Sequence, residues 1–197
     1  MDIALHRKLL EDISKGKETA LAELYGIFKG MVYNTALSYL QDQHAAEEVT
    51  QDVFVKIYQG ASSFEGKSAP STWIYRITIN KAKDYLDYQK RQKRFGFVSS
   101  LFPGDEAAKP IDLPVFDHPG AILENKENAR ILFQVIDLLP EQQKTAFILS
   151  YVEDLARQEV ADVMELSLKA IESLLQRAKN NLRKKLEDFH PQSRRNK

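Results

Sequence analysis

A block of prolines and glycines divides this chain into two parts and limits what it can fold into. Four of its seven prolines and three of its eight glycines lie between residues 95 and 120, with four acidic residues against one lysine. Proline fixes φ and removes a backbone donor, so this density excludes a helix. We therefore expect a flexible acidic linker at 95–122, folded domains at 1–94 and 123–190, and a basic tail at 191–197.

Apolar residues recur at three- and four-residue spacings on both sides of this linker, which is typical of amphipathic helices. One stripe is Ala45, Ala46, Val49, Val53 and Ile57, and another is Ile171, Leu175, Ala178 and Leu182. A further helix is expected at about 71–91. No stretch shows the sustained two-residue alternation of a strand. The expected fold class is therefore all-α, with two small helical domains joined by the linker.

The residue types argue against an enzyme. The absence of cysteine excludes disulfides and thiolate metal sites, and it favours a reducing compartment. The four histidines have no metal-ligand spacing, and the glycines form no phosphate-binding loop. Acidic residues are plentiful, so paired carboxylates stay an open alternative, but no pair stands out. We expect no catalytic residue, no metal and no cofactor. The N-terminus lacks a signal-type apolar block, and no segment approaches a membrane span, so we expect a cytoplasmic protein.

Charge is segregated along the chain although the formal net charge is zero, with 28 basic and 28 acidic residues. Six basic residues lie between 81 and 94, and eight between 177 and 197. One basic cluster in each domain is typical of a nucleic-acid-binding protein. Two solvated helix faces would give the same pattern.

Residues 157–182 have the layout of a helix-turn-helix. Val160, Ala161 and Met164 form the inner face of a first helix, Leu166 fills the turn, and Ser167 is a suitable N-cap for a second. The outer face of the second helix carries polar side chains that could reach base edges and phosphates in a major groove. An ordinary helical hairpin would show the same apolar spacing, so this motif alone leaves DNA binding open.

Three motifs together, in this order, resemble one family, the extracytoplasmic-function sigma factors of bacterial RNA polymerase. The motifs are AEEVTQDVF at 46–54, STWIYRI at 71–77 with the basic run after it, and LPEQQ at 139–143 followed by the helix-turn-helix. The resemblance covers nearly all of the chain except the linker. It implies a sigma factor that binds core RNA polymerase, recognises minus-thirty-five and minus-ten promoter elements and aids DNA melting. The implied partners are core polymerase, promoter DNA and a cognate anti-sigma factor.

The resemblance also implies a role for individual residues. Core polymerase would be bound by Glu48, Gln51, Asp52 and Lys56. The minus-ten element would be contacted by Phe64, Lys67, Ser68, Arg76, Asn80 and Lys83, with the loop at 64–68 holding an extruded base. The minus-thirty-five element would be contacted by Lys169, Ser173, Gln176, Arg177 and Lys184. Phe64 and Trp73 could instead be core residues, and the three acceptors on the polymerase-binding helix could be a solvated face.

Three residues depart from the family pattern. Glu165 stands in the turn where the family often has glycine, and Glu172 and Leu174 replace basic residues of the recognition helix. They leave open which bases are read. Two other functions stay possible, a stand-alone helix-turn-helix regulator and a helical adaptor that binds only protein. The sequence does not predict how the two domains sit relative to each other.

Overall fold

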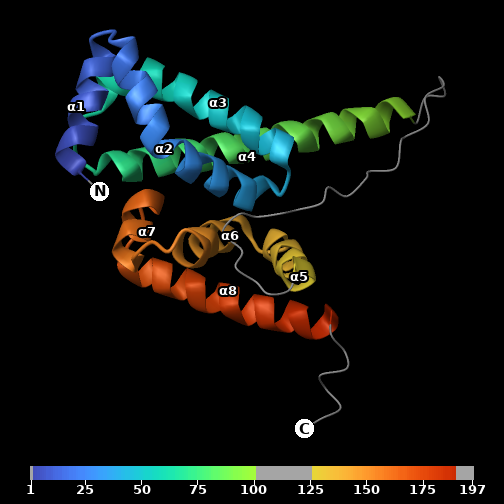
Figure 1. The fold of residues 1–197 in the computed structure, drawn as a ribbon. Helices are drawn as coiled ribbons and strands as arrows, with labels where there is room; N and C mark the ends of the chain where they lie inside the picture. Colours follow the sequence, from blue (N-terminus) through green and yellow to red (C-terminus); the bar gives the residue numbers. More distant parts are fainter. Residues whose placement is uncertain (1, 101–125, 190–197) are drawn as a thin grey trace.

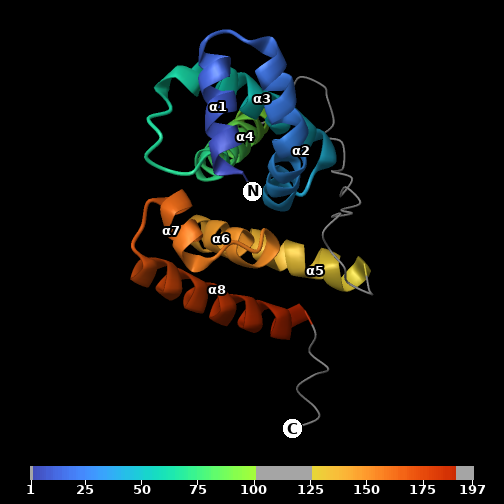
Figure 2. The ribbon, with the colours of Figure 1, turned by 60° about the vertical axis from the view of Figure 1, so that its left-hand side comes forward.

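The structure is a computed structural model that describes residues 2–100 and 126–189. Every regular element in these residues is helical, which confirms the all-α class. Helices α1–α4 form one group and α5–α8 a second, and the two groups lie against each other in both views (Figures 1 and 2). The linker prolines at 103–119 and the basic tail at 191–197 lie outside the described residues.

The N-terminal domain contains α1 (Ile3–Ser14), α2 (Glu18–Leu40), α3 (Gln43–Gly60), a short 3-10 turn (Ala61–Ser63) and α4 (Pro70–Ser100). The expected apolar stripe of α3 is buried, and it packs with Leu24, Phe28 and Ile74 from α2 and α4. Asp42 caps α3 by accepting a 2.7 Å hydrogen bond from the backbone N–H of Ala45. Stripe and cap together fix the face that α3 exposes.

Helix α4 continues to Ser100, so the expectation of an extended chain from residue 95 is wrong for residues 95–100. The first proline of the linker is Pro103, and only Gly96 disfavours helix before it. One glycine costs a helix about 1 kcal/mol, whereas propagation of an existing helix adds a hydrogen bond for each residue. Helix α4 is therefore longer than the apolar pattern alone predicts.

The C-terminal domain contains α5 (Lys126–Asp137), α6 (Glu141–Phe147), a π-helical turn (Ile148–Val152), α7 (Arg157–Met164) and α8 (Leu168–Phe189). Helices α7 and α8 are the expected helix-turn-helix. Ser167 caps α8 by accepting a 3.2 Å hydrogen bond from the backbone N–H of Ala170. Glu165, in the turn, has φ 54°. The apolar stripe of α8 is buried against α5, α6 and α7.

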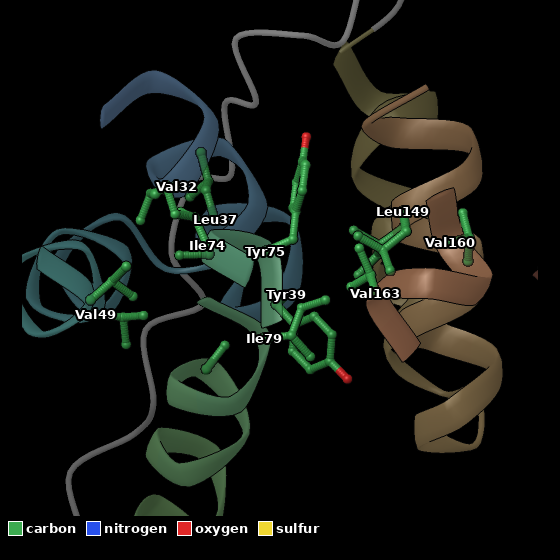
Figure 3. Packing of buried hydrophobic residues seen from close by; sticks show 14 of the residues in the cluster. Val32, Leu37, Tyr39, Val49, Ile74, Tyr75, Ile79, Leu149, Val160 and Val163 are labelled. Carbon is green, nitrogen blue, oxygen red and sulfur yellow. The ribbon is translucent and has the colours of Figure 1, made fainter. Parts of the chain in front are cut away.

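The two domains share an apolar contact zone between α2 and α4 on one side and α6, the π-helical turn and α7 on the other. Figure 3 shows Tyr39, Tyr75 and Ile79 facing Leu149 and Val163, and all five are buried. Helix α8 lies on the side of the C-terminal domain that faces away from α1–α4 (Figures 1 and 2). This arrangement places the candidate DNA-contacting residues of the two domains in different environments.

Candidate polymerase and nucleic-acid interfaces

The outer face of α3 carries the residues expected to contact polymerase. Glu48, Gln51, Asp52 and Lys56 are all exposed there. Asp52 forms a 3.3 Å ion pair with Lys81 of α4, with the Asp52 side chain still 58% exposed. The structure therefore places these four residues together on one surface that the C-terminal domain leaves open.

An apolar groove of about 660 Å³ lies beside this polar face, between α2 and α3. Tyr25, Val55 and Tyr58 line it and are 44%, 55% and 47% exposed, and Gln51 is at its edge. Exposed aromatic side chains of this kind are enriched where proteins bind proteins. The sequence reasoning missed this groove, although Val55 and Tyr58 stand three residues apart outside the buried stripe of α3, and that spacing was a usable signal.

The loop at 64–68, before α4, is held at Phe64 and at Gly66. Phe64 is half-buried, and its ring packs on Trp73 with 5.3 Å between centroids. Arg7 of α1 donates a 3.1 Å hydrogen bond to the carbonyl of Gly66, whose φ of 70° glycine adopts without strain. Lys67 is exposed and pairs with Glu65, and Ser68 is half-buried. Phe64 thus belongs partly to the core, and Arg7 supports the loop from a helix that sequence reasoning did not connect to it.

Arg76, Asn80 and Lys83 lie on one face of α4, at spacings of four and three residues. That face points at the C-terminal domain, with the three side chains lining a crevice beside Val163 and Glu165. Asn80 is exposed, but both cations are half-buried and paired. Lys83 Nζ lies 2.8 Å from a carboxylate oxygen of Glu141. The structure therefore brings the expected minus-ten residues of α4 together and sets them against α6 and α7.

The pairing of Arg76 involves the end of a helix as well as a carboxylate. Its Nε and Nη2 donate hydrogen bonds of 3.2 and 2.5 Å to the carbonyl of Asp162 in the last turn of α7. Its Nη1 lies 2.7 Å from a carboxylate oxygen of Glu165. Carbonyls in the last turn of a helix lack intrahelical donors and carry partial negative charge. Arg76 therefore caps α7 and neutralises the adjacent acidic side chain.

A buried polar cluster joins the domains at a second place. The hydroxyls of Tyr39 and Thr145 share a 2.7 Å hydrogen bond, and both residues are at most 2% exposed. Lys144 Nζ donates to the Tyr39 carbonyl at 2.7 Å and to the Asp137 carboxylate. Burial lowers the pKa of Lys144, while the charge of Asp137 opposes that shift. Gln41, at φ 56°, donates a 2.7 Å hydrogen bond to the carbonyl of Phe133.

Glu153 brings a carboxyl group into the contact zone from the C-terminal domain. It accepts a 3.3 Å hydrogen bond from the hydroxyl of Tyr75, and Thr35 is its other hydrogen-bond partner. Burial raises the pKa of Glu153 to about 7, although these two hydrogen bonds favour the charged form. Burial and the nearby carboxylate of Glu153 also raise the pKa of Tyr75. This part of the contact zone is therefore sensitive to protonation.

The outer face of α8 presents its polar residues to solvent. Lys169, Gln176, Arg177 and Lys184 are exposed, as is Glu172. Ser173 is half-buried, and its hydroxyl accepts hydrogen bonds of 3.3 and 2.7 Å from Arg177. Leu174 is only 7% exposed because it belongs to the apolar face. The structure therefore brings four expected minus-thirty-five residues to one open surface, while Ser173 is tied to Arg177.

Metal sites and membrane spans are both absent from the parts of the chain that the structure describes. No three histidine or acidic side chains gather there in a way that could hold a metal ion. None of the helices at 2–100 and 126–189 is both long and apolar enough to cross a membrane.

Comparisons with known proteins identify both domains. Residues 24–92 match the family described as Sigma-70 region 2, and residues 129–182 match Sigma-70, region 4. The RNA polymerase sigma-H factor of Pseudomonas aeruginosa is 30% identical, covering 92% of this chain and 93% of the relative. The ECF RNA polymerase sigma-E factor of Haemophilus influenzae is also 30% identical, covering 91% and 94%. The solved structure of CnrH in complex with the cytosolic domain of CnrY is 22% identical and aligns with a TM-score of 0.65, covering 93% of this chain and 98% of that one.

Proposed function

Because this chain belongs to the extracytoplasmic-function family of RNA polymerase sigma factors and so directs promoter-specific transcription, we propose how its residues divide that work. The N-terminal domain binds core polymerase through α3 and contacts the minus-ten element through α4 and the loop before it. The C-terminal domain contacts the minus-thirty-five element through α8. The stand-alone regulator and the protein-only adaptor are not favoured, because the chain matches both sigma regions in order.

The polymerase-binding surface is the outer face of α3 together with the groove beside it. Glu48, Gln51 and Asp52 supply acceptors and negative charge for a basic partner surface. Tyr25 and Tyr58 supply exposed aromatic area, which is the part of an interface that usually contributes most affinity. Lys56 lies at the same surface and would set register on the partner.

The minus-ten surface is the face of α4 that carries Arg76, Asn80 and Lys83, with Phe64, Lys67 and Ser68 in the loop before it. Arginine and lysine side chains at helical spacing suit a phosphate backbone, and Asn80 can hydrogen-bond a base. The exposed face of Phe64 is available to an unstacked base, while its other face rests on Trp73. Arg7 would keep this loop in place.

The minus-thirty-five surface is the outer face of α8. Lys169 and Gln176 are exposed polar side chains of this face and suit the reading of base edges. Arg177 and Lys184 suit phosphate anchoring, which adds affinity without sequence information. Because Arg177 already holds the Ser173 hydroxyl, Ser173 reads a base only if that contact is given up.

We propose that the protein acts in the cytoplasm as a regulatory subunit without catalytic residues, and that an anti-sigma factor controls it. Support for such a partner comes from CnrH, whose solved structure holds the cytosolic domain of CnrY. The experiment for an anti-sigma factor is co-purification of the tagged chain from its own cells. Recovery of a second protein in equal amount, apart from polymerase, is the expected result.

The exposed groove beside α3 is the main observation that supports polymerase binding at this surface. Substitutions of two exposed tyrosines, one in the groove and one outside it, test the assignment. Tyr58→Ala should weaken binding to core polymerase about tenfold or more, since truncating a buried aromatic anchor typically costs more than 1 kcal/mol. Tyr88→Ala is the control, because Tyr88 is also exposed, at 57%, but lies on α4 away from the groove. Affinity for core polymerase is measured by fluorescence anisotropy. Equal affinities of the two variants would show that the groove is not part of the polymerase-binding surface.

A further inference from the structure

The two cations of α4 that the proposed function assigns to promoter DNA, Arg76 and Lys83, are both occupied within the chain itself. Glu141 at the start of α6 pairs with Lys83, and Glu165 in the turn after α7 pairs with Arg76. Both partners belong to the C-terminal domain, 58 and 89 residues further along the chain. The proposed minus-ten face therefore has an intramolecular occupant.

The chemistry around Arg76 is that of an anion site. A guanidinium binds a phosphate through parallel N–H donors directed at neighbouring oxygens. Here the same donors are directed at a carboxylate oxygen of Glu165 and at the Asp162 carbonyl, which carries the partial negative charge of a helix end. A phosphate cannot use these donors while α7 is in place.

Glu165 holds this position at a conformational cost. Its φ of 54° is a left-handed conformation that glycine adopts freely and that costs another residue about 1 kcal/mol. Asp154 provides the comparison within the same domain, since it is also acidic, exposed and left-handed at φ 53°. Glu165 differs in that its carboxylate reaches across to the other domain. The contact with Arg76 gives a physical reason for an acidic side chain in this turn.

The ionic contacts lie beside a buried apolar zone. Ile79, between the two cations on α4, is 5% exposed and faces Val163 of α7, which is also 5% exposed (Figure 3). Farther along the contact, Tyr39 and Thr145 share their buried hydrogen bond. Among the described residues, no buried side-chain nitrogen or oxygen lacks a partner. The buried polar atoms of the contact are thus satisfied, as they are in a specific interface.

We propose that the C-terminal domain is an intramolecular cover for the minus-ten face, in which Glu165, Glu141 and the C-terminal end of α7 take the place of promoter phosphates on Arg76 and Lys83. The proposal rests on the assignment of these cations to the promoter. In the closed form Arg76 and Lys83 cannot contact promoter phosphates, so phosphate binding by these two cations requires that α6 and α7 move away from α4. The apparent affinity for any partner of the covered face is then reduced in proportion to the open fraction.

Thiol labelling of the free protein tests the cover, because the natural chain has no cysteine. In Ile79→Cys the single thiol lies under α7, and its labelling rate by a maleimide reports the open fraction even when that fraction is small. We expect labelling at least tenfold slower than for the thiol of Asn80→Cys, since Asn80 is exposed. Adding Glu165→Gly to Ile79→Cys should speed labelling about two- to fivefold, as loss of one partly exposed ion pair predicts.

Two controls make the outcome specific. Asp154→Gly removes the same charge and the same left-handed strain but no contact between domains, so adding it to Ile79→Cys should leave the labelling rate unchanged. In Val49→Cys the thiol is buried in the N-terminal domain away from the interface, so Glu165→Gly should leave its labelling unchanged as well.

Three results would overturn the cover. The first is labelling of Ile79→Cys as fast as that of Asn80→Cys. The second is an equal labelling rate of Ile79→Cys with Glu165→Gly and with Asp154→Gly. The third is that Glu165→Gly speeds the labelling of Val49→Cys as much as that of Ile79→Cys, which would indicate unfolding. These measurements need neither polymerase nor promoter.

Transcription by Asn80→Ala tests the minus-ten assignment separately, because Asn80 is exposed in the closed form. Unchanged dependence on the minus-ten sequence in that variant would count against the proposed function. Slow labelling of Ile79→Cys would in that case still stand as evidence of docking, so the two failures can be told apart.

Discussion

The two proposed DNA surfaces of this protein differ in whether their cations are covered by the other domain or exposed to solvent. On α4, Arg76 and Lys83 are half-buried and paired with acidic groups of the other domain. On α8, the helix on the far side of the C-terminal domain (Figures 1 and 2), Lys169 and Lys184 are exposed. Both surfaces are basic helix faces in the sequence, and tertiary packing makes them different. The comparison indicates that availability, rather than charge, distinguishes the two surfaces in the free chain.

Placing a charge in the apolar contact zone should have the largest effect on the difference between the two surfaces, because it should uncover α4. Ile79→Asp would bury a carboxylate under α7, where the neighbouring Arg76 and Lys83 already have acidic partners, and this costs several kcal/mol that are relieved when the domains separate. We expect separation of the domains, seen as a larger radius of gyration in small-angle X-ray scattering, with helical content unchanged. Lys169→Asp on the open face should leave the radius unchanged. A compact Ile79→Asp variant would show that the zone in Figure 3 does not hold the domains together.

Substitutions on the open face should sharpen the comparison through promoter choice. Gln176→Ala should relax discrimination at one minus-thirty-five position by about 1 to 3 kcal/mol, because an exposed amide can distinguish base edges. Lys184→Gln should instead weaken all promoters about equally and reduce the salt dependence of binding. Transcription from a promoter library with purified polymerase measures both. If the two variants keep the parental preference and strength, α8 is not the reading helix.

Acidity should favour the covered state through Glu153. Burial raises the pKa of Glu153 to about 7 in the closed form, and exposure to water on opening returns it towards the ordinary 4.5, so the closed form binds the proton more tightly. This contribution to closure is complete below about pH 4.5 and is lost as the pH rises to about 7. One proton changes the ratio of closed to open molecules by at most about tenfold per pH unit.

The labelling rate of Ile79→Cys, corrected for thiolate concentration, measures this effect. It should rise between about pH 4.5 and 7, and adding Glu153→Gln should flatten the profile because an amide does not titrate. Two other carboxylates near the contact zone are unchanged in this variant. They are Asp137, which pairs with Lys144, and Glu159, whose charge acts on Tyr75. A profile that Glu153→Gln leaves unchanged would assign the pH dependence to another group.

Salt should have the smallest effect on the ratio of closed to open molecules, and it should act only through the ion pairs of the covered α4 face. The pairs of Arg76 and Lys83 are partly exposed, so raising ionic strength from about 0.05 to 0.5 M should lower the ratio of closed to open molecules by no more than about fivefold. The buried Tyr39 and Thr145 contact is neutral and should persist. A loss of closure larger than this in salt would mean that ion pairs, rather than apolar packing, hold the domains together.

The sequence predicted the features that depend on local pattern. The apolar stripes identified the inner faces of α3 and α8, Ser167 was recognised as a cap, and Glu165 was located in the turn. The helix from 95 to 100 was missed because the prolines begin later than the loss of apolar periodicity. Leu174 was read as a lost cation, although its spacing from Ile171 and Ala178 already places it on the buried face.

Contacts between the domains could not be predicted in this way. Arg76 and Asp162 are 86 residues apart in sequence, and Tyr39 and Thr145 are 106 apart. Neither pair forms a spacing motif, and the sequence of the linker between them does not determine which residues of the two domains meet. Charge patterning suggested free basic faces, but it holds no information on which acidic side chain from a distant helix will reach them. The covered state of α4 is therefore visible only in three dimensions.

The position of Glu165 far behind α4 in the chain also has a consequence for synthesis on the ribosome. Glu165 is added 65 residues after Ser100, the last residue of α4, which takes on the order of 3 to 13 s at about 5–20 residues per second. Domains generally fold as units from the N-terminal end. For seconds in each round of translation, the newly made α1–α4 domain thus exists before its proposed cover has been synthesised, and in that interval the proposed minus-ten face is open to the cell.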